Sequence, residues 1–152
     1  MGVPGWTSTV YRALTPNTAR SFRAFDTYWL GPSFGGLPLF ALSNDEAQRT
    51  TTHIDTVSVT YANPFVNGVR ASGQITLIER TPLGPTDIPT PSAPTPASES
   101  KQPVQVAGRS ATLFRNGSVV RLELTIGGTF LTIHGTDVSQ VLQAAGSLQK
   151  LN

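Results

Sequence analysis

Two glycine-containing turns in the last third of the chain constrain its fold most strongly. Asn116-Gly117 and Gly127-Gly128 each separate short runs of alternating apolar and polar residues. Both pairs suit the type I′ turn of a two-residue β-hairpin, because that turn requires a positive φ at each central position. The segment from Val104 to Asn152 is therefore predicted to begin as an antiparallel β-meander.

The lengths of the two turns also predict the strand register. Two-residue loops pair Leu124 with Leu131 across the second turn and Leu113 with Val120 across the first. Both registers place the same apolar residues on one face of the sheet: Val120, Leu122, Leu124, Ile126, Leu131 and Ile133. Because successive strand residues point to opposite faces, the other face receives Arg121, Glu123, Thr125 and Thr132.

A helix is predicted after the third strand of the meander. Thr136 or Asp137 supplies a side-chain cap, and Gln140 follows Asp137 at the spacing of a capping box. The apolar residues beyond this cap repeat at the helical period and form one stripe: Val138, Val141, Leu142, Ala145 and Leu148. We expect this stripe to pack on the apolar face of the sheet.

The first half of the chain predicts further strands, at residues 25–30, 37–42, 56–62 and 74–80. Residues 8–23 leave room for a short helix interrupted at Pro16. Charged residues make up 13% of the chain, about half the usual quarter, so few are available for helix exteriors. The expected fold class is α+β: an antiparallel sheet of about six or seven strands, a C-terminal helix packed on one face and a short helix near the N-terminus.

A stretch rich in Pro, Ser and Thr separates the two halves. Most of the 12 prolines fall between Pro82 and Pro103, and proline interrupts both helices and strand ladders because it lacks an N–H donor. The roughly fifty residues that follow are too few for a stable core of their own. Residues 1–152 are therefore expected to form a single domain, with residues 83–103 as a flexible loop within it.

Composition argues against several classes of function. The net charge is only +2 and the arginines are scattered, so no nucleic-acid partner is expected. The absence of cysteine excludes thiol chemistry, zinc fingers and disulfide scaffolds. The pairs His53 with Asp55 and His134 with Asp137 each fall short of three ligands, so neither a metal nor a cofactor is expected.

One motif resembles a catalytic signature. Residues 31–35 read G-P-S-F-G and match the G-x-S-x-G elbow of serine hydrolases, with Ser33 in the position of the nucleophile. Such an elbow must open into a helix, whereas Gly36 and Pro38 follow immediately. A turn between two strands is therefore the preferred interpretation, and a small serine hydrolase is kept as an alternative.

The densest group of aromatic residues surrounds this motif and comprises Tyr28, Trp29, Phe34 and Phe40. Aromatic side chains at alternating strand positions are usually core residues. They can also line an apolar groove for a peptide or an acyl chain, of the kind that opens between a curved sheet and its helix. These four residues are the candidate ligand-binding residues.

Residues 28–39, YWLGPSFGGLPL, resemble a Y-W-L-G-x-x-F-x-G-L-P-L pattern of uncharacterised exported or membrane-tethered proteins of actinobacteria and related bacteria. The Gly-rich strands and residues 136–148 are similar to the end of extracytoplasmic domains in bacterial lipoproteins and anti-sigma factors. The resemblance implies a cell-envelope location and a binding or sensing role, and it transfers no catalytic residue. The chain departs from that pattern in having neither a lipobox cysteine nor a signal peptide, a departure that removal of a leader or membrane anchor from the full-length protein would explain.

Together these features predict a non-enzymatic extracytoplasmic domain that binds or senses a lipid, a peptide or a protein partner. Two alternatives remain at this point. The first is a structural or interaction module that makes its contact through the Pro-rich loop, and the second is the hydrolase that would use Ser33.

Overall fold

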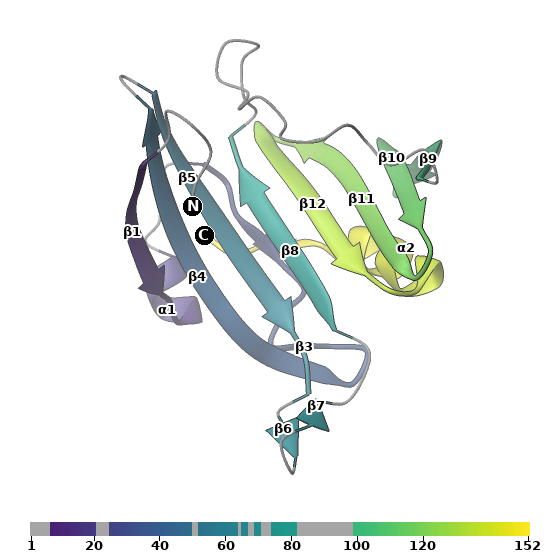
Figure 1. The fold of residues 1–152 in the computed structure, drawn as a ribbon, viewed down its shortest axis with the longest axis horizontal. Helices are drawn as coiled ribbons and strands as arrows, with labels where there is room; N and C mark the ends of the chain where they lie inside the picture. The colour runs from purple at the N-terminus through teal and green to yellow at the C-terminus, as the bar shows by residue number, and fades with distance from the viewer. Residues whose placement is uncertain are drawn as a thin grey trace.

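Antiparallel strands dominate the computed structural model, which describes residues 7–20, 25–49, 52–63, 65–66, 69–70, 74–81 and 99–152. The main sheet contains nine strands (Figure 1). Eight of them lie side by side in the order β1 (Thr7–Ala13), β4 (Leu37–Arg49), β5 (Thr52–Tyr61), β8 (Ile75–Arg80), β12 (Thr129–Gly135), β11 (Val119–Ile126), β10 (Arg109–Asn116) and β9 (Ser100–Val106). The ninth, β3 (Ser33–Phe34), pairs with the start of β4.

Smaller elements complete the described part of the chain. Two short helices occur, α1 (Pro16–Ala19) and α2 (Val138–Gly146). Two additional strand pairs are formed by β2 (Tyr28–Trp29) with β13 (Gln149–Lys150) and by β6 (Phe65–Val66) with β7 (Val69–Arg70). The predicted class, an antiparallel sheet with a C-terminal helix, is confirmed, whereas the predicted count of six or seven strands was too low.

The predicted meander is present and has one more strand than expected, β9. At the Gly127-Gly128 turn the predicted register is confirmed, since Leu124 pairs with Leu131. Both glycines have positive φ, at 53° and 84°, as a type I′ turn requires.

The predicted register of the first hairpin was wrong by two residues. Leu113 pairs with Leu122 rather than with Val120, because Gly117 and Ser118 form the turn and Asn116 remains in the strand. Of these three residues only Gly117 has a positive φ. A shift of two residues keeps every side chain on its predicted face. The six apolar residues named above are accordingly all buried.

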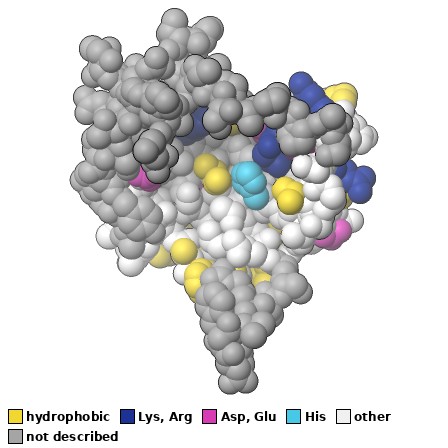
Figure 2. Space-filling view, in the orientation of Figure 1, with side chains coloured by type: hydrophobic (Ala, Val, Ile, Leu, Met, Phe, Trp, Pro, Cys, Tyr) yellow, Lys and Arg dark blue, Asp and Glu magenta, His cyan; other side chains and the backbone are white. Residues whose placement is uncertain are grey.

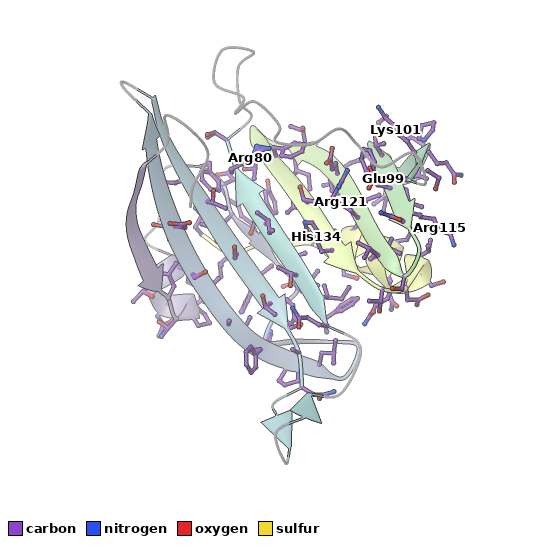
Figure 3. The ribbon with its side chains drawn as sticks, viewed as in Figure 1. Arg80, Glu99, Lys101, Arg115, Arg121 and His134 are labelled. Carbon is purple, nitrogen blue, oxygen red and sulfur yellow. The ribbon has the colours of Figure 1, made fainter. Side chains whose placement is uncertain are left out.

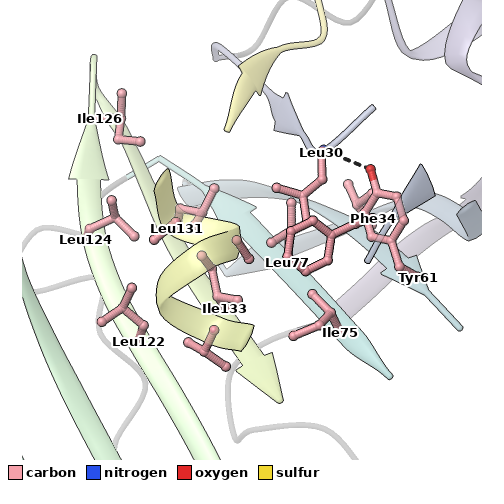
Figure 4. Close-up of a cluster of buried hydrophobic side chains, with 14 of the residues drawn as sticks. Leu30, Phe34, Tyr61, Ile75, Leu77, Leu122, Leu124, Ile126, Leu131 and Ile133 are labelled. Atoms are coloured by element: carbon pink, nitrogen blue, oxygen red, sulfur yellow. Dashed lines mark hydrogen bonds between the residues drawn. The ribbon is translucent and has the colours of Figure 1, made fainter. Parts of the chain in front are cut away.

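Helix α2 packs on β11 and β12, as predicted from its apolar stripe (Figure 4). Asp137 caps it, because its side chain accepts a hydrogen bond from the backbone N–H of Gln140 at 3.2 Å. The helix lies so close to the sheet that a Cβ added at Gly135 would stand 2.8 Å from Cγ2 of Val141. The space between helix and sheet is thus filled by the protein's own side chains.

Two predictions for the N-terminal half need correction. Residues 7–13 form strand β1 rather than part of a helix, and Pro16 begins α1 instead of interrupting one. Proline is well suited to the first helical position, where its missing N–H would have no partner within the helix. Of the strand predicted at residues 25–30, only β2 is extended, and it pairs with β13 rather than with the main sheet.

The segment at residues 25–31 lies across the apolar face of the sheet beside α2, held there by side-chain hydrogen bonds. The Tyr61 hydroxyl accepts from the N–H of Leu30 at 2.8 Å and donates to the carbonyl of Gly31 at 2.7 Å (Figure 4). Near the chain end, the Asn152 side chain accepts from Thr27 and donates to the carbonyl of Phe25. One face of the sheet is therefore covered both by α2 and by this segment, and we call it the covered face.

The predicted flexible loop at residues 83–103 falls mostly outside the described residues. Its last four residues, 100–103, belong to the edge strand β9, which therefore begins inside the predicted loop. Strand β9 accommodates Pro103 although proline has no N–H. Counted from the Ala107-Gly108 hairpin, Pro103 and Thr112 form a non-hydrogen-bonded pair, so the nitrogen of Pro103 faces away from β10.

Candidate functional site

The second face of the sheet, which we call the outer face, carries most of the charged and aromatic side chains of the meander. It is the face seen in Figure 1, with α2 behind the strands. The register aligns its side chains in cross-strand rows. The residues that define it between β8 and β9 are Thr76, Ile78, Arg80, Lys101, Pro103, Ser110, Thr112, Phe114, Arg121, Glu123, Thr125, Phe130, Thr132 and His134.

One row on the outer face places an aromatic ring between two cations. Phe114 pairs with Lys101 on β9 and with Arg121 on β11. The Arg121 guanidinium carbon lies 4.1 Å from the centroid of the ring, and the Lys101 ammonium lies 5.9 Å from it. Each such contact contributes about 0.5–2 kcal/mol, with the larger value reached when the cation is desolvated. The ring and its cations thus form a preassembled surface element.

Arg121 is also held by two carboxylates. Its Nε lies 3.2 Å from Glu123, and one terminal nitrogen lies 3.6 Å from Glu99, whose side chain is only 12% exposed (Figure 3). The Nε of Arg121 has no hydrogen-bond partner among the described residues, so two ion pairs and the stacked ring hold this side chain. Arg121 is therefore both fixed in position and neutralised in charge.

A second cation stacks on an aromatic ring at the β8 side of the face. Arg80 pairs with Phe130 across β8 and β12, and its guanidinium carbon lies 4.6 Å from the ring centroid. Burial lowers the pKa of Arg80, and Glu123 opposes this effect in part. Unlike Arg121, Arg80 has no carboxylate partner among the described residues.

His134 lies in the middle of the outer face, paired with Arg121 on one side and with Thr76 on the other (Figure 3). Figure 2 shows a histidine here with hydrophobic side chains nearby. Burial lowers its pKa, the positive charge of Arg121 lowers it further, and Glu123 acts in the opposite direction. The imidazole is therefore neutral at pH 7 and can both donate and accept a hydrogen bond.

A groove of about 620 Å³ crosses the outer face over β10, β11 and β12. Phe130 and Glu123 line it together with the hydroxyl residues Ser110, Thr112 and Thr125, and Pro103 lies at its β9 side. Its size falls within the range of ligand-binding clefts, which is roughly 300–1,000 Å³. An apolar ring flanked by hydroxyl groups and charges can contact an extended chain through both side-chain and polar interactions.

The structure separates the four aromatic residues that the sequence singled out. Phe34 is buried in the core, with its ring edge-on to Tyr61 at 6.5 Å. Tyr28 and Trp29 are half-buried on β2. Phe40 is 44% exposed and borders a depression of about 350 Å³ that Leu14 also lines. The local density of aromatic residues did not identify Phe114 and Phe130, which share the outer face with Arg121.

Glu79 is a completely buried acid on the covered face. Its Oε1 accepts a hydrogen bond from the N–H of Tyr28 at 2.5 Å, and its Oε2 has no hydrogen-bond partner among the described residues. Burial raises the pKa of this carboxyl well above its usual value, and the hydrogen bond opposes the shift. Glu79 and Glu123 point to opposite faces, so the two strand acids do not flank a common cleft.

The residues considered for catalysis or metal binding are dispersed. Ser33 is exposed at the β3–β4 hairpin, whose turn is made by Gly35 and Gly36 at positive φ, so the motif forms the predicted turn between strands. Asp137 caps α2, and the side chain of His53 lies outside the described residues. Among the described residues, no group of three or more His, Cys, Asp or Glu side chains could hold a metal ion.

Comparison with family models, curated proteins and solved structures finds no match to this chain. No helix in the described ranges is long and apolar enough to cross a membrane. Functional inference therefore rests on the geometry of the outer face.

Proposed function

We propose that this chain is a non-enzymatic binding domain that contacts a peptide or protein partner through its outer face. The observation that carries the proposal is the pair of aromatic rings, Phe114 and Phe130, each stacked with a cation beside the 620 Å³ groove. Aromatic residues and arginine are the residue types that most often dominate the energy of protein interfaces. Here they stand on strands of a sheet whose opposite face carries the buried core.

Packing favours a peptide or protein over a lipid as the partner. An acyl chain would need an apolar space between sheet and helix, and that space is occupied by buried side chains such as Ile133 and Val141. The groove on the outer face is instead lined by charged and hydroxyl side chains as well as by Phe130. Such a mixed surface suits a polypeptide, which offers hydrogen-bonding groups along its whole length.

The geometry of β9 favours binding to the face of the sheet over addition of a strand at its edge. In the described part of the chain, β9 pairs only with β10. On the edge of β9 that faces away from β10, Pro103 leaves the middle position without an N–H donor, and the nearby Lys101 carries a charge. Both features disfavour the pairing of another strand along an edge.

A selection from a random peptide library tests the proposal. Peptides enriched on the wild-type protein should bind the variant Phe130→Ala at least about tenfold more weakly, because truncation of a central aromatic anchor usually costs more than about 1 kcal/mol. Val119→Ala is the matched control, since Val119 is an apolar side chain that is 56% exposed at the end of the outer face and does not line the groove. Enriched peptides that bind both variants as well as the wild type would contradict the proposal.

The extracytoplasmic location implied by the sequence resemblance is part of the same proposal. A binding domain of the cell envelope meets its partner outside the cytoplasm. Protease treatment of intact cells that express the full-length protein should then degrade the domain, while a cytoplasmic marker survives. Protection of the domain until the cells are lysed would contradict this location.

A further inference from the structure

Building on the proposed function, we infer that the partner is an acidic peptide segment, whose carboxylates bind Arg80 and Lys101 at the two sides of the outer face. The charges of the outer face complement those of an acidic peptide. Glu99 and Glu123 both lie within 3.6 Å of Arg121, so that guanidinium offsets part of the negative charge of these two acids. Arg80 and Lys101 have no carboxylate partner among the described residues.

The surroundings of Arg80 also favour a carboxylate ligand. The guanidinium is half-buried and stacked on Phe130, a residue that also lines the groove. Burial has removed part of its hydration, and the charge of Glu123 compensates for this only in part, without forming an ion pair with Arg80 among the described residues. A carboxylate entering the groove would restore that loss through charge-assisted hydrogen bonds, which a planar guanidinium can donate in a bidentate manner.

The distance between Arg80 and Lys101 suits a short extended peptide. Arg80 on β8 and Lys101 on β9 are separated by four strand intervals, β8–β12–β11–β10–β9. The register also offsets them by four residues along the strands, because the row of Arg80 reaches β9 at Gln105. Offsets of about 19 Å across the strands and about 13 Å along them place the two cations roughly 23 Å apart, which an extended peptide spans with about seven residues. The hydroxyl groups of Thr112 and Thr125 line the groove between them and can bond the peptide in its middle.

The same features favour a peptide over other anions. A nucleic acid or an anionic membrane is bound by clustered Lys and Arg that track a continuous charge. The described cations here are instead separated: Arg80 and Lys101 lie at the two sides of the outer face, Arg121 between them is neutralised, and Arg109 lines the groove. Two discrete carboxylates fit this pattern better than a continuous polyanion does.

Fluorescence anisotropy with labelled heptaglutamate and heptalysine peptides tests the inference. Heptaglutamate should bind at least about tenfold more tightly than heptalysine at low salt, and its affinity should fall as salt rises. Arg80→Gln and Lys101→Gln should each weaken it several-fold. Arg115→Gln, which removes an exposed charge at a covered-face position of β10, should change the affinity by less than about twofold.

The outcomes separate this inference from the proposed function. Equal binding of the two peptides, or unchanged binding by Arg80→Gln and Lys101→Gln, would overturn the inference, even if library peptides still required Phe130. Tighter binding to phosphatidylserine vesicles or to single-stranded DNA than to heptaglutamate would also overturn it. If Arg80→Gln fails to fold by circular dichroism, Lys101→Gln on the exposed edge strand decides the question.

Discussion

The two faces of this sheet are built from alternate residues of the same strands, yet they differ in almost every physical property. On the covered face, apolar side chains fill the space beneath α2 and the segment at residues 25–31. On the outer face, half-buried aromatic rings carry stacked cations beside a groove. The covered face therefore supplies most of the stability of the fold. Phe114 and Phe130 lie outside that core and are available for recognition.

Neighbouring residues on β11 provide the largest contrast between the faces. Leu124→Ala should lower the free energy of unfolding by about 2–5 kcal/mol, because it leaves a cavity on the covered face. Thr125→Ala, one residue further along and exposed on the outer face, should change it by less than about 0.5 kcal/mol. Urea denaturation measures both values, and equal losses would show that the two faces do not differ as described.

Gly135 tests how closely α2 approaches the covered face. Gly135→Ala should cost about 1–3 kcal/mol, because the new methyl group would lie 2.8 Å from Val141 and 2.9 Å from Ile75. The double variant Gly135→Ala/Val141→Ala should lose less stability than the sum of the two single variants. Thermal unfolding provides the comparison, and strict additivity would contradict the contact.

Glu79 predicts a pH dependence of stability that originates on the covered face. Because the folded protein holds this proton more tightly than the unfolded chain does, the free energy of unfolding should fall as pH rises above 4.5 towards the raised pKa. Glu79→Gln should remove that fall and stabilise the protein at neutral pH. Glu123→Gln is the outer-face control and should leave the fall in place. Urea denaturation between about pH 4 and about pH 8 checks both variants.

Ala107 predicts the smallest effect, at the turn that joins the edge strand β9 to β10. It has a φ of 51°, a left-handed conformation that is unfavourable for alanine. Ala107→Asn should raise the free energy of unfolding by about 0.5–1 kcal/mol, because asparagine tolerates this region better. Ala107→Val should have the opposite sign. A loss of stability in the asparagine variant would be inconsistent with this turn.

The sequence was most informative where local geometry decides the structure. The register across Gly127-Gly128 was predictable because both glycines adopt the positive φ of their turn type. At the first hairpin the choice of turn residues was wrong, since Asn116 stays in β10. The assignment of side chains to faces survived this error, because a shift of two residues preserves the alternation.

Non-local contacts could not be predicted in the same way. The pairing of β2 with β13 joins residues more than a hundred positions apart, and no short pattern encodes it. The candidate site has the same character, because the sheet register brings Arg80, Phe114 and Phe130 onto one face. A local density of aromatic residues pointed instead to Phe34, which the fold uses in its core.

The affinity of a library-selected peptide for Phe130→Ala, measured beside Val119→Ala and the wild type, tests the central claim most directly. If the groove on the outer face is the binding surface, Phe130→Ala should lose at least about tenfold in affinity, while Val119→Ala, outside the groove, should bind as the wild type does. Affinities that are equal for all three proteins would contradict the assignment of binding to the outer face.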